Sequence, residues 1–135
     1  MNSEDFLKLP NFTELEVEAT GADIVDVDFE TLNLLQRVRS YTGKRVGLIK
    51  NGLTTGEHQS ELHGGGKAVD FKFLDPISPK LVIFAMIKAG FNGVGVYRWS
   101  KTRFTFHGDS RKFPANWFRV PNQSDVSIFT AGICL

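Results

Sequence analysis

Three residues of this chain have types and spacing that could hold a metal ion. His63 and Asp70 enclose the glycine run of the segment HGGGKAVD, and His107 follows in a later apolar segment. Two neutral imidazoles and one carboxylate are a common ligand set for a catalytic zinc, which keeps its fourth position for water. Such an ion lowers the pKa of its water to about 7 and polarises a carbonyl oxygen. The set therefore indicates hydrolysis, provided that the fold brings the three residues together.

Asp109 is the nearest candidate for moving the proton. It stands two residues after His107, so on a strand it would share a face with that histidine, about 6 to 7 Å further along. A carboxylate there could serve as general base and acid, which we take as the hypothesis. It could instead orient a ligand histidine through the second ring nitrogen.

The same residues also allow a simpler interpretation. Runs of glycine usually form turns, and a histidine beside them is more often solvated or hydrogen-bonded than bound to a metal. Glycines 64 to 66 would equally let a loop wrap closely around an ion and leave room for a substrate. Short motifs carry a high false-positive risk, so spacing alone does not decide between the two interpretations.

Helix and strand patterns place the candidate residues. Asp28 is a plausible N-cap for a helix over DFETLNLLQRVRS, which ends at Thr42-Gly43, and KRVGLIK predicts a strand beneath it. In KAVDFKF, alternation puts Val69, Phe71 and Phe73 on one face and Ala68, Asp70 and Lys72 on the other. Asp70 should therefore point away from the apolar side.

A second helix and a hairpin complete the expected framework. Ser78, Pro79 and Gly90 delimit a helix over SPKLVIFAMIKAG, whose packing stripe we expect to include Leu81, Phe84 and Ala85. GVGVYRWSKTRFTFHGD predicts two antiparallel strands joined near residues 100–102, with His107 and Asp109 on one face and Phe104 and Phe106 on the other. The tail DVSIFTAGICL is apolar enough for a final strand.

Composition excludes several classes of protein. Sixteen basic and fifteen acidic residues give a net charge of +1, which is not the footprint of a nucleic-acid binder. Cys134 is the only cysteine, so neither a disulfide scaffold nor a cysteine-rich zinc site is available. The acidic start MNSEDFLKLPNF lacks the features of a signal peptide, and no apolar run is long enough to cross a bilayer. We expect one domain over residues 1–135, made in the cytoplasm and not inserted in a membrane.

Two motifs in order resemble those of a known family. The segment from His63 to Asp70 resembles the His-x-x-Gly-x-Ala-x-Asp motif of zinc peptidases of the D-Ala-D-Ala carboxypeptidase and L-alanyl-D-glutamate endopeptidase family. The segment HGD at 107–109, after GVGVY at 93–97, resembles their late His-x-Asp motif, and Arg111 and Trp117 continue the likeness. LLQRVRSYTGKRVGLIKNGLTT is similar to the helix, strand and Ser-Gly-x-Arg-Thr turn that precede the first motif, so the likeness spans about 28–119.

The resemblance implies a small α+β fold whose central antiparallel sheet carries the zinc ligands His63, Asp70 and His107. It implies hydrolysis of peptide bonds in bacterial peptidoglycan, by a carboxypeptidase or an endopeptidase. An enzyme of this kind without a signal peptide would act on the wall after release, as a phage lysis enzyme does, or be carried in a phage particle.

Several positions depart from the family pattern. Thr54 and Asn51 replace the arginine and serine of the turn, Glu61 replaces a serine, and Phe104 stands where several relatives have an acidic residue. Without the arginine, Lys50 is a weaker anchor for a substrate carboxylate. The candidate substrate-binding residues are Lys50, Gln59, Tyr97, Arg111 and Trp117.

The aromatic residues and Arg111 also have a structural alternative. Tyr97, Trp99 and Trp117 could line a peptide groove or complete the edge of the core, and Arg111 could pair with Asp109 or with a substrate carboxylate. The departures at Thr54 and Phe104 favour a second hypothesis for the whole chain. In it, a catalytically degenerate relative keeps the zinc for stability and serves as a structural or wall-binding module.

Overall fold

A five-stranded sheet with two long helices on one face organises the computed structural model, which describes residues 1–53 and 66–128. The elements are η1 (Ser3–Lys8), α1 (Glu14–Glu18), η2 (Ile24–Asp26), α2 (Phe29–Thr42), β1 (Val46–Leu48), β2 (Ala68–Phe73), α4 (Pro79–Ala89), β3 (Gly93–Arg98), β4 (Phe104–Asp109) and β5 (Ala115–Arg119). The expected α+β fold is confirmed, and none of the helices in the described part is long and apolar enough to cross a membrane.

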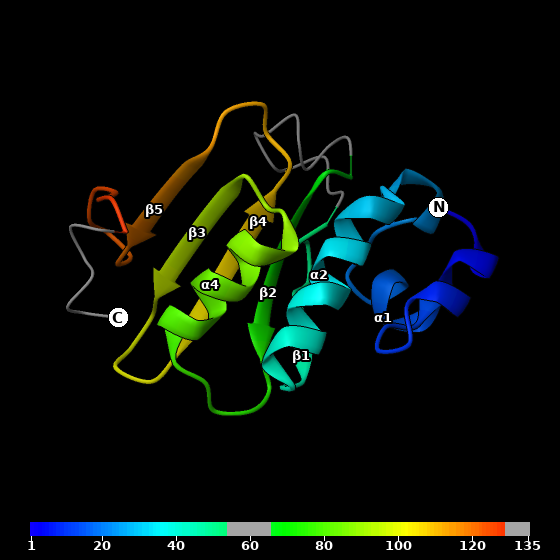
Figure 1. Ribbon diagram of the computed structural model, residues 1–135, viewed down its shortest axis with the longest axis horizontal. Helices are drawn as coiled ribbons and strands as arrows, with labels where there is room; N and C mark the ends of the chain where they lie inside the picture. Colours follow the sequence, from blue (N-terminus) through cyan, green and yellow to red (C-terminus); the bar gives the residue numbers. More distant parts are fainter. Residues whose placement is uncertain (54–65, 129–135) are drawn as a thin grey trace.

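The strands lie in the order β1-β2-β4-β3-β5, which can be followed across Figure 1. The first three neighbouring pairs are antiparallel, including the predicted β3–β4 hairpin, but β5 runs parallel to β3. The sheet is therefore mixed, and the parallel edge strand β5 was not predicted from the sequence. β2 and β4, which carry Asp70 and His107, lie side by side inside the sheet.

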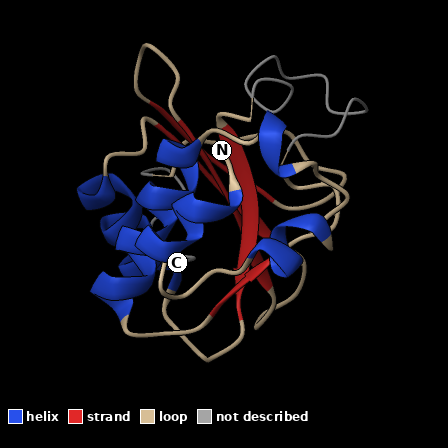
Figure 2. Cartoon of the chain, turned by 90° about the vertical axis from the view of Figure 1, so that its right-hand side faces the viewer, coloured by secondary structure: helices blue, strands red, loops and turns tan. Residues whose placement is uncertain are grey.

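The two long helices, α2 and α4, lie on the same face of the sheet. α2 packs against α4 and β2, and α4 packs against β3. Figure 2 shows the sheet close to edge-on, with most of the helical structure to its left and short helical segments also to its right. The strands turn apolar side chains toward this layer, among them Val69, Phe71 and Phe106, and the rings of Phe71 and Phe106 stack 5.6 Å apart. The other face of the sheet is left for the candidate site.

The first long helix begins and ends as its sequence predicts. The Asp28 carboxylate accepts a hydrogen bond from the Thr31 backbone N–H at 3.3 Å, and Gly43 closes the helix with φ of 64°. A side-chain cap and a left-handed closing glycine both satisfy groups that helix ends leave unpaired. Both ends of helix α2 are thus capped.

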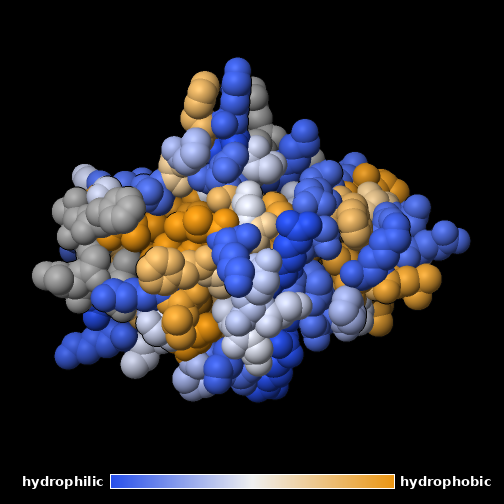
Figure 3. All heavy atoms as spheres, viewed as in Figure 1, coloured by the Kyte–Doolittle hydropathy of each residue, from blue (hydrophilic) through white to orange (hydrophobic). Residues whose placement is uncertain are grey.

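The predicted packing stripe of α4 is partly wrong. Ala85 is buried, but Leu81 and Phe84 are 59% and 68% exposed. The buried side is formed by Val82, Ile83, Ala85, Met86 and Ala89. Because nearly every position of this helix is apolar, periodicity could not select the inward face. The outer side chains contribute to the hydrophobic surface over α4 in Figure 3.

An ion pair fastens the start of β1 to the turn after β2. Arg45 donates from Nη2 to Asp75 Oδ1 at 2.8 Å and from its backbone N–H to Oδ2 at 2.8 Å. These two kinds of hydrogen bond lower the pKa of Asp75 to about 2.

The lowered pKa gives a signed prediction for stability against pH. The unfolded carboxyl titrates near 3.9, so the stabilisation by the pair should be present above about pH 4 and lost as the pH falls toward 2. Urea unfolding of the wild type and Asp75→Asn at several pH values measures this. The difference between them should shrink on acidification; a difference that grew would contradict the assignment.

Candidate metal and peptide site

The open face of the sheet brings Asp70, His107 and Asp109 together. Asp70 is directly opposite His107 in the β2–β4 register, and Ala68 is opposite Asp109. Since side chains on a strand alternate between faces, these three residues all point away from the helices, as alternation predicted. Two of the three predicted metal ligands therefore meet across one strand pair.

The imidazole of His107 is held at both ring nitrogens. Nδ1 lies 2.9 Å from Asp70 Oδ1, and Nε2 lies 2.7 Å from Asp109 Oδ2. The ring also lies 5.2 Å from the ring of Trp117, and the side chain is only 8% exposed. These contacts fix both the position and the rotation of the ring.

Asp109 is completely buried, and its oxygens are fully occupied. Arg111 donates from Nε to Oδ1 at 2.8 Å, from Nη2 to Oδ2 at 2.6 Å and from its backbone N–H to Oδ1 at 3.1 Å. With His107 Nε2 as the fourth contact, all the acceptor sites of the carboxylate are used. Of the two roles foreseen for Arg111, the structure shows the ion pair with Asp109. Of the two roles foreseen for Asp109, this geometry favours orientation of His107.

Neighbouring groups raise the pKa of His107 and lower the pKa of Asp109. Burial alone would keep His107 neutral, but its hydrogen bonds to Asp109 and Asp70 outweigh burial and raise its pKa. Burial also opposes ionisation of Asp109, yet the hydrogen bonds from Arg111 and His107 hold its pKa well below the ordinary range. Asp109 is therefore a fixed negative charge behind the imidazole.

Two glycines of β3 make room for this arrangement. A Cβ at Gly93 would overlap the carboxylate of Asp109, and a Cβ at Gly95 would lie 2.5 Å from Cε2 of Trp117. Trp117 also carries the Arg111 guanidinium 4.8 Å from its ring centre, and its Nε1–H donates to the Tyr97 hydroxyl at 2.9 Å. The segment GVGVY is thus shaped by the side chains that reach over it from β4 and β5.

Gly66 of the first motif has a role in packing rather than in contact with the site. Its φ is 69°, and a Cβ there would overlap the carbonyl oxygen of Asp26 and lie 2.8 Å from the backbone nitrogen of Asp28. The Asp28 N–H also donates to the Gly66 carbonyl at 3.2 Å. This glycine lets the chain enter β2 directly against the start of α2.

The donor pair fits a zinc ion. Imidazole nitrogen and carboxylate oxygen are ordinary zinc ligands, and two such atoms bound at about 2.0 to 2.2 Å with tetrahedral angles lie roughly 3.3 to 3.6 Å apart. The observed 2.9 Å between His107 Nδ1 and Asp70 Oδ1 requires only a small separation of the two side chains. Within residues 1–53 and 66–128 no group of three candidate ligands occurs, and the third predicted ligand, His63, lies outside the described residues.

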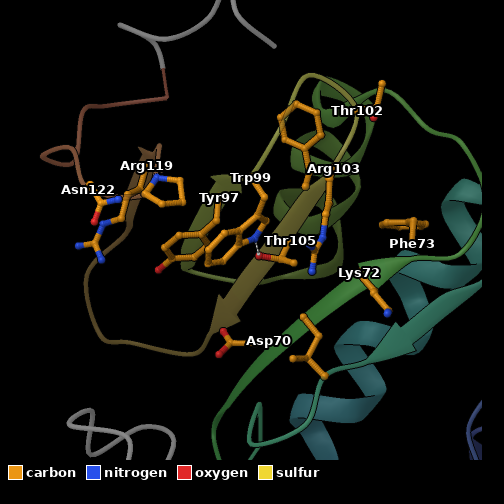
Figure 4. A pocket seen from close by; sticks show the side chains of 13 residues that line it. Asp70, Lys72, Phe73, Tyr97, Trp99, Thr102, Arg103, Thr105, Arg119 and Asn122 are labelled. Carbon is orange, nitrogen blue, oxygen red and sulfur yellow. Dashed lines mark hydrogen bonds between the residues drawn. The ribbon is translucent and has the colours of Figure 1, made fainter.

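A groove of about 620 Å³ adjoins the pair, and Asp70 forms part of its wall. Figure 4 shows Tyr97, Trp99 and Thr105 along the groove, with Lys72 and Arg103 nearby and Arg119 at the far end. Tyr97 and Trp99 thus line a groove, as one alternative held, whereas Trp117 packs on His107. Burial raises the pKa of Tyr97, so its hydroxyl stays protonated and can donate a hydrogen bond.

The remaining predicted residues that the structure describes lie outside this groove. Lys50 is exposed in the turn after β1 and is absent from the groove wall. Gln59, Thr54 and Glu61 lie in residues 54–65, outside the described part. Lys72 and Arg103 were missed as candidates, although alternation already placed both on the face of Asp70 and His107.

Comparisons with protein-family models, with curated proteins and with solved structures found no match for this chain.

Proposed function

We propose that this protein is a zinc-dependent peptidase that hydrolyses peptide bonds of bacterial peptidoglycan, as a carboxypeptidase or an endopeptidase. The observation that supports it is the Asp70–His107 pair, with the far side of the imidazole held by Asp109 and Arg111. A ligand histidine with its second nitrogen on a carboxylate is the usual arrangement around catalytic zinc. The two motifs that resemble the family carry these same residues.

Each group has a task in this proposal. His107, Asp70 and His63 would hold the ion, and Asp109 with Arg111 would keep the imidazole in one orientation. A zinc ion bound there supplies polarisation of the scissile carbonyl and activation of a water molecule. The groove along Tyr97 and Trp99 would position the peptide beside Asp70.

A specific observation favours the second candidate function, a catalytically degenerate structural or wall-binding module. Asp109 has every oxygen occupied and no exposed surface, so it is poorly placed to take a proton from water. Phe104, at the position where several relatives have an acid, is packed against the core. A peptidase reaction would then need a proton acceptor other than Asp109, and Phe104 cannot supply one.

Clearing of purified bacterial cell walls tests the proposal. The wild type with zinc should lower the turbidity of a wall suspension, and 1,10-phenanthroline should stop the clearing. His107→Ala should be inactive and bind less zinc, whereas Lys101→Gln, an exposed change in the β3–β4 turn, should behave as wild type.

The zinc content of the same samples separates the two candidates. About one zinc per chain with no clearing, and no new peptide ends by mass spectrometry, would favour the degenerate module. Zinc binding that survives a His63→Ala, His107→Ala double substitution would rule out the proposed ligand set.

A further inference from the structure

We propose that Lys72 and Arg103 form a carboxylate-binding subsite in the groove, which selects peptides with an anionic group a short distance from the cleaved bond. The inference rests on the proposed function for the identity of the ligand as a wall peptide.

The strand register places Lys72 and Arg103 on the same face of the sheet as Asp70 and His107. Asp70 is opposite His107 and Phe71 opposite Phe106, so Lys72 is beside Thr105. Lys72 is two residues from Asp70 and Arg103 is four residues from His107, which corresponds to about 7 Å and 13 Å along the strands. Both residues line the same groove as Asp70.

These two cations have no neutralising partner in the described structure. The groove's other arginine, Arg119, is paired with Asp125 at 2.5 and 3.0 Å. Among residues 1–53 and 66–128, the side chains of Lys72 and Arg103 form no hydrogen bond or ion pair with one another or with any other residue. Among the described residues of the groove wall, Asp70 is the one acidic side chain, and it faces His107. The groove therefore presents positive charge with room for an anion.

Two aromatic side chains of the groove, Trp99 and Tyr97, suit the rest of a bound peptide. Trp99 is held by a hydrogen bond from Nε1 to Thr105 Oγ1 at 2.9 Å, and Tyr97 by the hydrogen bond from Trp117. Their ring faces can pack on small apolar side chains and on peptide planes. Figure 4 shows these rings between Arg119 and Arg103 along the groove.

The distances limit which carboxylate can be bound. A carboxylate between Lys72 and Arg103 would be about 7 to 10 Å from the Asp70–His107 pair, allowing for the reach of the side chains. Since an extended peptide rises about 3.3 Å per residue, the anionic group belongs to a residue two or three positions from the cleaved bond. That residue can carry it as a side-chain carboxylate or as the free carboxyl end of a short peptide.

Calorimetric titration with synthetic peptidoglycan stem peptides tests the subsite. The probes are the peptide with its carboxylates free, the peptide amidated at its carboxyl end, and the peptide amidated at its side-chain carboxylate. 1,10-Phenanthroline prevents turnover and, being uncharged, does not compete for the cations; circular dichroism confirms the fold of each sample. The wild type should bind the free peptide about ten- to a hundredfold more tightly than one of the amides, the loss expected for one charge-assisted contact.

Substitutions assign the preference to the groove. Arg103→Gln and Lys72→Gln should each weaken binding of the free peptide, and the preference over the amide should largely disappear, because the variant no longer senses the carboxylate. Lys101→Gln, which removes a charge from the same hairpin outside the groove, should keep the preference for the free peptide. The amide that binds weakly identifies the source of the carboxylate.

The proposal is overturned if the wild type binds all three peptides equally, or if Arg103→Gln and Lys72→Gln keep the full preference. This result is separate from wall clearing. Arg103-dependent binding without clearing would leave the subsite standing and reject the peptidase. Wall clearing by the wild type, with no effect of either substitution on peptide affinity or KM, would support the peptidase and reject the subsite.

Discussion

Replacing Asp109 with asparagine should weaken zinc binding about tenfold to a hundredfold. The carboxylate holds Nε2 of His107 at 2.7 Å, and loss of such a partner releases the ligand ring and lowers its basicity. The substitution also leaves the charge of Arg111 without its partner, so we expect the free energy of unfolding to fall by about 1 to 3 kcal/mol. Competition with a zinc-binding dye and urea unfolding measure the two effects.

Asp125→Asn is the matched control for this experiment. Asp125 also pairs with an arginine, Arg119, but both side chains are substantially exposed. Exposed pairs contribute about 0 to 1 kcal/mol, so the control should change stability little and zinc affinity not at all. A contrary result is equally definite: if Asp109→Asn keeps full zinc affinity while turnover drops by about two to four decades, Asp109 is the general base.

Replacing Gly66 with alanine should strongly destabilise the fold. The new Cβ would overlap the backbone oxygen of Asp26, and φ of 69° is unfavourable for alanine. A left-handed residue costs about 1 to 2 kcal/mol, and forced overpacking adds about 1 to 3 kcal/mol. We therefore expect the free energy of unfolding to fall by about 2 to 5 kcal/mol, measured by chemical denaturation.

Gly43→Ala separates the two contributions. Gly43 has nearly the same φ, 64°, but a Cβ there would meet nothing within 4 Å. It should therefore show the conformational cost alone, about 1 to 2 kcal/mol. If both substitutions lowered the free energy of unfolding equally, the close contact between Gly66 and the start of α2 would add nothing to the cost of the alanine.

The parts of the site that strand alternation controls could be predicted from the sequence. Alternation in KAVDFKF and RFTFHGD placed Asp70, His107 and Asp109 on one face, because on a strand the face depends only on parity. The caps of α2 are equally local: Asp28 and Gly43 satisfy groups of their own helix. Such features need no knowledge of the rest of the chain.

Features that depend on distant neighbours could not be predicted. The parallel pairing of β5 with β3 joins segments across a long connection, and no local pattern specifies it. The buried side of α4 depends on where the sheet lies, since the helix is apolar nearly all round. One of the two interpretations of the glycine run gave Gly66 a role in wrapping a loop around an ion, whereas in the structure its absent side chain admits the backbone of residues 26 to 28.

Separation of the sheet into two faces has a consequence for how such a chain can change during evolution. Phe71 and Phe106 pack beneath the helices, while their sequence neighbours Asp70 and His107 point to the open face. Selection for a stable core and selection for the proposed metal site would therefore act on alternate positions of the same strands. A descendant could lose the proposed ligands one at a time while the core positions stay as they are, so inactive descendants of an active ancestor would keep its fold. Asp109 is the exception, because its burial ties the orientation of the site to the stability of the sheet.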